Sequence, residues 1–216
     1  MSSLNALIKE LCPKGVEYKL FFNVAKYIRG ITYSKNDETS NDESYKVLRA
    51  NNITLSSNKL NYDDVKKVKT SVKVKDEQWL KKGDILICAG SGSKEHIGKV
   101  AFINKDIDYT FGGFMGVIRC AECIIPSYMF HVLTSNIFRE HIGIAVNSTT
   151  INNINNQTFE NFQIPVPPVK VQKEIVRILD KFNELENELE IEIDLRKKQY
   201  EYYRNKLLNF EEYDNE

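Results

Sequence analysis

Cysteine and histidine are the residues most able to hold a metal or carry redox chemistry, and this chain has four cysteines and three histidines. Cys120-Ala-Glu-Cys123 has the spacing of a ligand or redox pair, but no second cysteine pair follows it. His131 and His141 are too far apart for a zinc finger, and three histidines define no catalytic triad. We therefore expect no metal site and reduced, buried or incidental thiols, which indicate a reducing compartment.

The motifs for chemistry on DNA are incomplete. Methyl transfer to an amino group would need a glycine-rich turn and an Asn/Asp-Pro-Pro-aromatic tetrad, but Met115 stands at the last glycine position of residues 111–116 and the only Pro-Pro follows Val166. The Pro-Asp half of a common metal-dependent nuclease motif is absent. Gly90-Ser-Gly-Ser-Lys94 does not have the spacing of a phosphate-binding P-loop. The sequence predicts no catalytic residue and favours a binding module.

Polar clusters suited to nucleic-acid recognition are better represented. Arginine can bind guanine with two hydrogen bonds, asparagine can bind adenine in the same way, and serine or threonine can contact either. Turn or capping chemistry would use the same residue types, so each cluster has a structural alternative. The candidate DNA-binding residues form three clusters along the chain: Arg49, Asn51 and Asn52; Ser91, Ser93 and Lys94; Asn147, Ser148 and Thr149.

Charge is unevenly distributed along a chain whose net charge is zero. Residues 1–168 carry 21 Lys and Arg against 17 Asp and Glu, whereas residues 169–216 carry 9 against 13. Seven lysines between Lys66 and Lys82 form either a solvated face or a phosphate-facing patch. No apolar run approaches the ~20 residues that span a bilayer, and the N-terminus lacks the pattern of a secretory signal. We therefore expect a cytoplasmic protein without membrane contact.

The elements that must position these residues form a strand-rich α+β body. Apolar periodicity predicts a helix over residues 4–11 and a second over residues 128–142. The strongest strand signal covers residues 84–89, which a Gly/Ser loop joins to a strand over residues 99–103 in an antiparallel pair. Further strands are expected over residues 45–47, 53–55, 69–75 and 111–120.

A rigid hinge and a long helix follow the body. Pro167-Pro168 fits the first turn of a helix, and neither glycine nor proline interrupts the chain beyond it. Apolar residues then advance by threes and fours with a mean of 3.5, which is the coiled-coil spacing, although Arg196 interrupts the row. A helix of roughly 60 Å would overhang a body of this size, so packing on its own body is the weaker alternative. The expected dimer seam consists of Ile175, Ile178, Phe182, Leu185, Leu189, Ile193, Tyr200, Tyr203 and Leu207.

Three segments in order along the chain resemble the specificity (S) subunit of type I restriction-modification systems. Residues 11–18, LCPKGVEY, resemble the opening of that subunit. Residues 80–87, LKKGDILI, together with Gly90-Ser-Gly-Ser and residues 97–101, IGKVA, resemble the middle of its target recognition domain. Residues 164–169, IPVPPV, with residues 172–176, QKEIV, resemble the entry to its conserved helix and are the most specific of the three.

The resemblance implies a non-catalytic subunit that reads double-stranded DNA and docks methyltransferase (M) subunits and, through them, nuclease-translocase (R) subunits. S-adenosylmethionine, ATP and Mg are then expected only in the partner subunits, with no cofactor in this chain. The usual S subunit has two recognition domains and two conserved helices, whereas this sequence resembles one of each. The resemblance therefore implies either a functional half that pairs with itself or a truncated, silent cassette, and the heptad-like seam favours the first.

The resulting hypothesis divides the chain into a DNA target recognition domain at residues 1–165 and a conserved helix for dimerisation and methyltransferase docking at residues 166–216. Two helices would pair antiparallel, so that the dimer reads both halves of an interrupted palindrome. Two alternatives belong to other classes. The first is a small autonomous nuclease or methyltransferase, which the missing motifs disfavour, and the second is a coiled-coil adaptor whose body binds protein instead of DNA.

Overall fold

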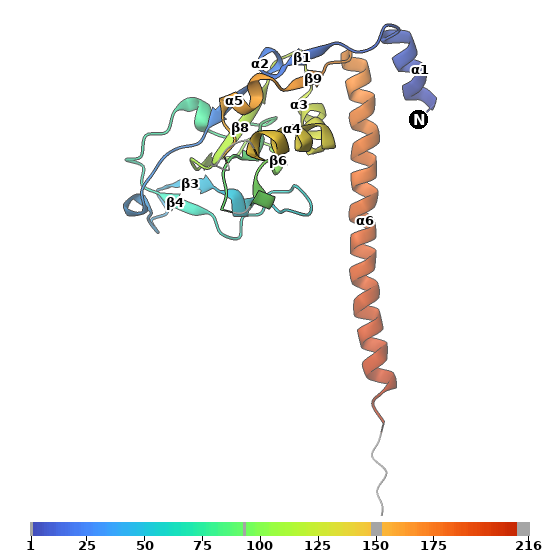
Figure 1. Cartoon of the computed structure of the whole chain (residues 1–216). Coiled ribbons are helices and arrows are strands. Elements are labelled where there is room, and N and C mark those ends of the chain that lie inside the picture. Colours follow the sequence, from blue (N-terminus) through green and yellow to red (C-terminus); the bar gives the residue numbers. More distant parts are fainter. Residues whose placement is uncertain (1, 93, 148–152, 211–216) are drawn as a thin grey trace, which may run out of the picture. The chain divides into compact units, whose positions relative to one another are not determined.

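The computed structural model describes residues 2–92, 94–147 and 153–210. The chain divides into two compact units, Met1–Ile175 and Val176–Glu216. The predicted boundary at residues 165 and 166 precedes the first residue of the long helix, Val169, and the first turns of that helix belong to the first unit. The predicted class, an α+β body followed by one long C-terminal helix, is confirmed (Figure 1).

The first unit begins with α1, as expected from its amphipathic pattern, and ends with the start of the long helix. Its remaining helices are short, and four are single 3₁₀ turns. The helical elements are α1 (Ser2–Leu11), α2 (Phe21–Val24), η1 (Lys35–Asp37), η2 (Ala50–Asn52), η3 (Asp76–Gln78), η4 (Lys94–His96), α3 (Pro126–Thr134), α4 (Asn136–Asn147), α5 (Asn156–Glu160) and α6 (Val169–Leu207).

Nine strands form three sheets among the described residues. They are β1 (Tyr18–Leu20), β2 (Ala25–Arg29), β3 (Tyr45–Leu48), β4 (Lys66–Val68), β5 (Ile85–Cys88), β6 (Val100–Phe102), β7 (Thr110–Phe111), β8 (Met115–Cys120) and β9 (Gln163–Pro165). The central sheet has the order β2-β8-β5-β6 and is antiparallel throughout. A second sheet has the order β4-β3-β7, in which β3 and β7 run parallel, and β1 pairs with β9.

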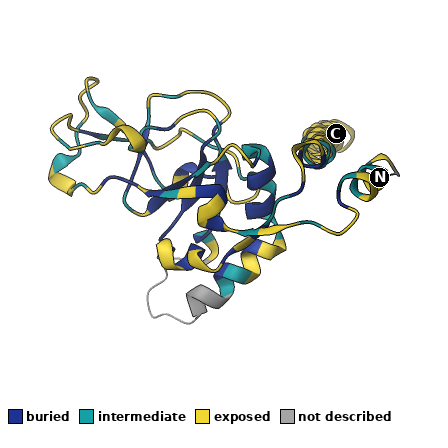
Figure 2. Cartoon of the chain, turned by 90° about the horizontal axis from the view of Figure 1, so that it is seen from above, coloured by how far each residue is buried: buried dark blue, intermediate teal, exposed yellow. Residues whose placement is uncertain are grey.

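The core lies on both faces of the central sheet. All four residues of β5 are buried, which explains its continuous apolar sequence. Leu86, Cys88 and Val117 pack with Leu48 and Phe111 of the second sheet. Figure 2 shows these buried segments at the centre of the first unit, with exposed loops around them. The second sheet is therefore fixed against the first by apolar packing, and the loops between the two sheets have a defined position.

Two predicted strands are wrong, and two predicted elements are divided. Residues 53–55 and 69–75 are not strands, although Ile53 is buried and makes an isolated bridge with Leu60. The strand predicted over residues 111–120 is interrupted by a turn in which Met115 N donates to Gly112 O (2.8 Å). The helix predicted over residues 128–142 is broken at Ser135, whose hydroxyl donates to Val132 O (2.6 Å).

Candidate nucleic-acid interface

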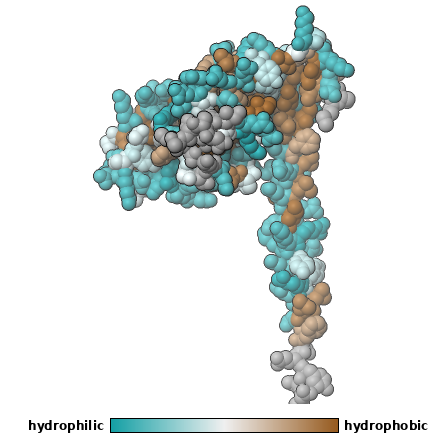
Figure 3. Space-filling model, viewed as in Figure 1, coloured by the Kyte–Doolittle hydropathy of each residue, from teal (hydrophilic) through white to brown (hydrophobic). Residues whose placement is uncertain are grey.

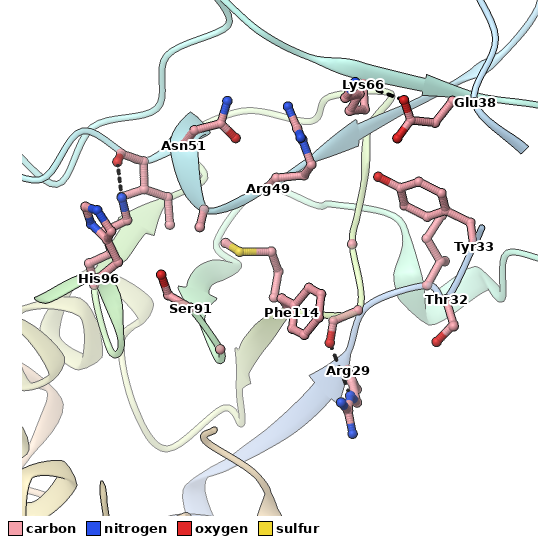
Figure 4. A pocket seen from close by; sticks show the side chains of 18 of the residues that line it. Arg29, Thr32, Tyr33, Glu38, Arg49, Asn51, Lys66, Ser91, His96 and Phe114 are labelled. Carbon is pink, nitrogen blue, oxygen red and sulfur yellow. Dashed lines mark hydrogen bonds and ion pairs between the residues drawn. The ribbon is translucent and has the colours of Figure 1, made fainter. Parts of the chain in front are cut away.

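A cavity of about 1150 Å³ lies in the first unit where several strands end. The register explains why loops that are distant in sequence meet there. Arg29 at the end of β2 pairs with Gly116, Cys88 at the end of β5 pairs with Met115, and Leu48 at the end of β3 pairs with Phe111. Residues of the segments next to these ends line the cavity, among them Arg29, Tyr33, Arg49, Ser91 and Phe114 (Figure 4).

Glycine permits the close approach of two of these segments. Ile31 N donates to Phe111 O (2.8 Å), and Gly30 N donates to Met115 O (3.1 Å). A Cβ atom at Gly30 would collide with the carbonyl oxygens of Phe111 and Gly112. A larger residue at position 30 would therefore separate the loop after β2 from the turn between β7 and β8, and it would change the shape of the cavity.

The cavity lining is basic. Five cationic side chains line it, against the single carboxylate of Glu38: Arg29, Lys35, Arg49, Lys66 and Lys99. Lys66 Nζ pairs with Glu38 Oε2 (2.9 Å), and Arg29 Nε donates to Gly113 O (3.2 Å). Because the cations exceed the carboxylates, the lining is suited to a polyanion such as the phosphate backbone of a nucleic acid.

Arg49 and Asn51, both predicted as DNA contacts, lie together at the cavity. Arg49 Nη2 donates to Asp64 Oδ2 (2.6 Å), and Asn51 Nδ2 donates to the same oxygen (2.9 Å). Both residues line the cavity, at the beginning of η2. An arginine and an asparagine beside one another offer the donors and acceptors that guanine and adenine edges require.

Asn52 corrects the prediction for its cluster. Its side chain is fully buried. Its Oδ1 accepts from Arg49 N (2.9 Å), and its Nδ2 donates to Asn61 O (3.2 Å) and Asp64 O (3.3 Å). Because its amide is used inside the protein, Asn52 holds η2 and the loop before β4 together and does not present a surface to a base.

The other two predicted clusters are only partly described. Ser91 lines the cavity. Ser93, Ser148 and Thr149 lie outside the described residues. For the remaining two predicted residues the backbone alone is described: η4 begins at Lys94, and α4 ends at Asn147.

Several cavity residues were not predicted from the sequence. Phe114 is 71% exposed in the turn between β7 and β8, so its ring is available for stacking at the cavity. Lys99 Nζ donates to Ile53 O (2.8 Å), and burial lowers the pKa of this lysine. Burial raises the pKa of Tyr33, which also lines the cavity. Phe114 and Lys99 each follow a glycine directly, whereas Tyr33 lies in the segment after β2.

Some of the seven lysines between Lys66 and Lys82 hold the loop of residues 36–42 in place. Lys67 Nζ pairs with Asp42 Oδ1 (2.7 Å), and this contact lowers the pKa of the Asp42 carboxyl. Lys69 Nζ donates to Asn36 O (2.8 Å). Together with the Lys66–Glu38 pair, these contacts fasten residues 36–42 to β4. At least three of the seven lysines therefore hold a loop in place, and their charges are less available to a phosphate than those of unpaired lysines.

The start of α6 is fastened to the first unit by Gln172. Its side chain is fully buried. Oε1 accepts from Ile125 N (2.8 Å), while Nε2 donates to Pro167 O (2.8 Å) and Cys123 O (3.1 Å). A single side-chain amide therefore supplies the hydrogen-bond partners of backbone groups both before α3 and in the hinge before α6.

The predicted seam lies on α6, which extends for 39 residues, or about 58 Å. Its first two members, Ile175 and Ile178, are half-buried. Its other members are exposed in the chain by itself: Phe182, Leu185, Leu189, Ile193, Tyr200, Tyr203 and Leu207. Leu189, Ile193 and Tyr200 line a shallow groove of about 580 Å³ along the helix. Figure 3 shows apolar side chains along much of α6, interrupted by a hydrophilic stretch.

All four cysteines are free, Cys12 and Cys88 being buried and Cys123 exposed. Burial raises the pKa of Cys120 to about 12. Within the described ranges no group of three His, Cys, Asp or Glu side chains is arranged to hold a metal ion, and no helix there is long and apolar enough to cross a membrane.

A family model for the type I restriction modification DNA specificity domain matches residues 13–195. The chain is 33% identical over 170 residues to the specificity subunit of the type I restriction enzyme EcoKI from Escherichia coli, which is 78% of this chain and 36% of that protein. The StySPI specificity subunit from Salmonella potsdam matches with the same identity and coverage. The chain thus spans little more than a third of the length of these curated relatives.

Solved structures show the same fold. The HsdS subunit from Thermoanaerobacter tengcongensis has a TM-score of 0.58 at 14% identity, with 85% of this chain and 43% of that chain covered. The type I restriction-modification S subunit from M. genitalium has a TM-score of 0.57 at 12% identity, with 91% and 48% covered. At such low identity the similarity concerns the fold alone.

Proposed function

Because this chain belongs to the family of type I restriction-modification DNA specificity domains, we propose that it reads one half of a two-part DNA site through the basic cavity. The observation that carries the proposal is the convergence of Arg49, Asn51 and Ser91 with further cations in that one cavity. Cations bind phosphates irrespective of sequence, whereas the arginine and asparagine side chains distinguish bases.

The chain acts as a recognition subunit, and its partner subunits carry out methyl transfer and DNA cleavage. The sequence has no complete motif for methyl transfer or DNA cleavage, and the relatives it matches are named specificity subunits. Methyltransferase subunits would bind S-adenosylmethionine, and nuclease-translocase subunits, where present, would use ATP and Mg. Such a complex would work on chromosomal or incoming DNA in the cytoplasm.

Two copies pair through α6 to read both half-sites. This part of the proposal is supported by the exposed apolar seam of α6. Apolar side chains at coiled-coil spacing gain stability by packing against a second helix. Antiparallel pairing gives a two-fold symmetric dimer, and such a dimer recognises an interrupted palindrome.

The salt dependence of DNA binding tests the cavity as the DNA-binding surface. Lys35 lines the cavity and is exposed, whereas Lys105 is also exposed but lies outside the lining. Each phosphate contact contributes about −0.9 to the slope of log K against log salt. On duplex DNA we expect Lys35→Glu to reduce the magnitude of this slope by about 0.9, which corresponds to the loss of one phosphate contact. Lys105→Glu should leave the slope unchanged. Equal effects of the two charge reversals would show that the cavity is not the DNA-binding surface.

A further inference from the structure

Asp64 joins the two side chains that offer base-reading groups at the cavity. A single oxygen of its carboxylate, Oδ2, accepts from Arg49 Nη2 (2.6 Å) and from Asn51 Nδ2 (2.9 Å). Asp64 stands in the loop before β4, whereas Arg49 and Asn51 flank the first residue of η2. The carboxylate therefore couples the positions of two side chains that would otherwise rotate independently.

The carboxylate of Asp64 is not the main support of this local fold. Its side chain is 64% exposed, and ion pairs so accessible to water contribute only about 0–1 kcal/mol to stability. The loop is held to η2 mainly through backbone groups: Asn52 Nδ2 donates to Asp64 O (3.3 Å), and Asn61 Nδ2 donates to Asn51 O (2.9 Å). The acidic side chain is thus available for a role other than folding.

Arg49 depends on Asp64 for its orientation. Among the described residues, Nε of Arg49 is buried and has no hydrogen-bond partner. Arg49 Nη2 donates to Asp64, both to Oδ2 and, at 3.5 Å, to the backbone carbonyl oxygen. Two-point recognition of guanine requires a guanidinium in a fixed plane, so a holder that sets this plane before binding lowers the entropy lost on binding.

The charge of Asp64 has a second consequence. An exposed carboxylate paired with a lining arginine of a basic cavity weakens attraction to phosphates of every sequence, because like charges repel. A side chain that orients base-reading groups and also weakens sequence-independent binding increases the ratio of specific to non-specific affinity in two ways.

On the premise of the proposed function, we propose that Asp64 is a specificity-determining positioning residue, which holds Arg49 and Asn51 as one base-reading unit and opposes non-specific binding to DNA. Asp64 need not touch the DNA. It acts through the two side chains that it orients.

Selection from random DNA tests this proposal with a matched control. The full-length chain would bind a duplex library randomised over about three helical turns, and the bound fraction would be quantified and sequenced. Asp63→Ala is the control, because Asp63 is the adjacent exposed carboxylate, and its substitution removes the same charge without a recorded contact to Arg49 or Asn51. Asp64→Asn removes the charge but keeps an oxygen that can accept from Arg49. Trp79 fluorescence during thermal unfolding verifies that each variant folds.

We expect Asp64→Ala and Asp63→Ala to increase total DNA binding several-fold by the same charge effect. Only Asp64→Ala should lower the enrichment of the preferred sequence, by about 10-fold, because one two-point base contact discriminates by roughly 5- to 150-fold. Asp64→Asn should restore part of the enrichment and keep the higher total binding. Equal loss of enrichment in the Asp63 and Asp64 variants would overturn the positioning role. A wild-type chain that enriches no sequence would instead overturn the proposed function itself.

Discussion

Replacing Gln172 with alanine removes the amide that joins the first turn of α6 to the backbone before α3. The substitution leaves Ile125 N and the carbonyl oxygens of Cys123 and Pro167 without the partners that they have at 2.8–3.1 Å. Each unsatisfied buried polar group costs about 1–3 kcal/mol, and water entering the vacated space would recover part of this loss. We expect the free energy of unfolding of the first unit to fall by about 2–4 kcal/mol, a large part of the stability of an ordinary domain.

Urea unfolding measures this loss. The single tryptophan, Trp79, lies in the first unit and packs edge-on against Tyr45, so its fluorescence reports unfolding of that unit. The midpoint should fall in Gln172→Ala with an unchanged slope. Gln199→Ala is the control, because Gln199 is exposed on the same helix and accepts a hydrogen bond from Arg196 Nη1 (3.1 Å). This substitution should change stability by less than about 0.5 kcal/mol.

Glutamate at position 172 provides a pH-dependent check on the same reasoning. A carboxylate there would face two carbonyl oxygens in a buried site, so its pKa in the folded state should be raised. Stability should therefore increase as the pH falls through that raised pKa, because the protonated acid can donate as the amide does. Gln172→Ala should show no such gain. A change below about 0.5 kcal/mol in Gln172→Ala would refute the view that this amide holds the junction.

Two further predictions concern the helix and the thiols. Leu189→Asp should raise the dissociation constant of the proposed dimer at least about 1000-fold in sedimentation experiments, because two buried leucines are lost per dimer at about 2 kcal/mol or more each. Ile191→Asp should have little effect, since Ile191 is similarly exposed but lies about 200° around the helix from Leu189. Equal effects of the two substitutions would place the interface elsewhere. At pH 8 iodoacetamide should alkylate the exposed Cys123 in the folded chain, while the half-buried Cys120, with a pKa of about 12, should react only in denaturant. Mass spectrometry that found both cysteines modified at similar rates would contradict the difference in their surroundings.

The sequence predicts best those elements whose own pattern decides their structure. The apolar run of residues 84–89 and its Gly/Ser loop led to the antiparallel β5–β6 pair, and the uninterrupted pattern after Pro168 led to α6. The strand predicted over residues 69–75 is wrong because Val72 and Val74 are partly buried against a small core cluster without any ladder. Val72 N donates to Lys69 O (3.1 Å), which forms a turn. The alternating burial in this segment therefore arises in a loop and not in a paired strand.

The predicted strand at residues 53–55 is wrong for a similar reason. Ile53 is buried, but Thr54 N donates to Lys59 O (2.9 Å) and Asn58 N donates to Thr54 O (3.0 Å). Asn58 adopts a positive φ of 53°, which asparagine tolerates better than most residues. Local hydrogen bonds thus closed a loop where the apolar residues alone indicated an extended strand.

The candidate site was predictable only in part. Residue type was sufficient to select Arg49, Asn51 and Ser91, which the fold brings to one cavity. Residue type could not separate Asn51 from Asn52, because burial of Asn52 depends on a loop 9 to 12 residues further along the chain. It also could not indicate Asp64, whose importance comes from a contact across that loop. Strand register, which brings these segments together, is a tertiary property.

The most direct test of the account is methylome sequencing of cells that carry this gene, lack it, or carry the Arg49→Ala variant. The account predicts a methylated two-part motif with two-fold symmetry that disappears without the gene and is lost or altered in the variant. An unchanged set of methylated motifs after deletion of the gene would contradict the central claim. So would an asymmetric motif in cells where this chain is the only specificity subunit.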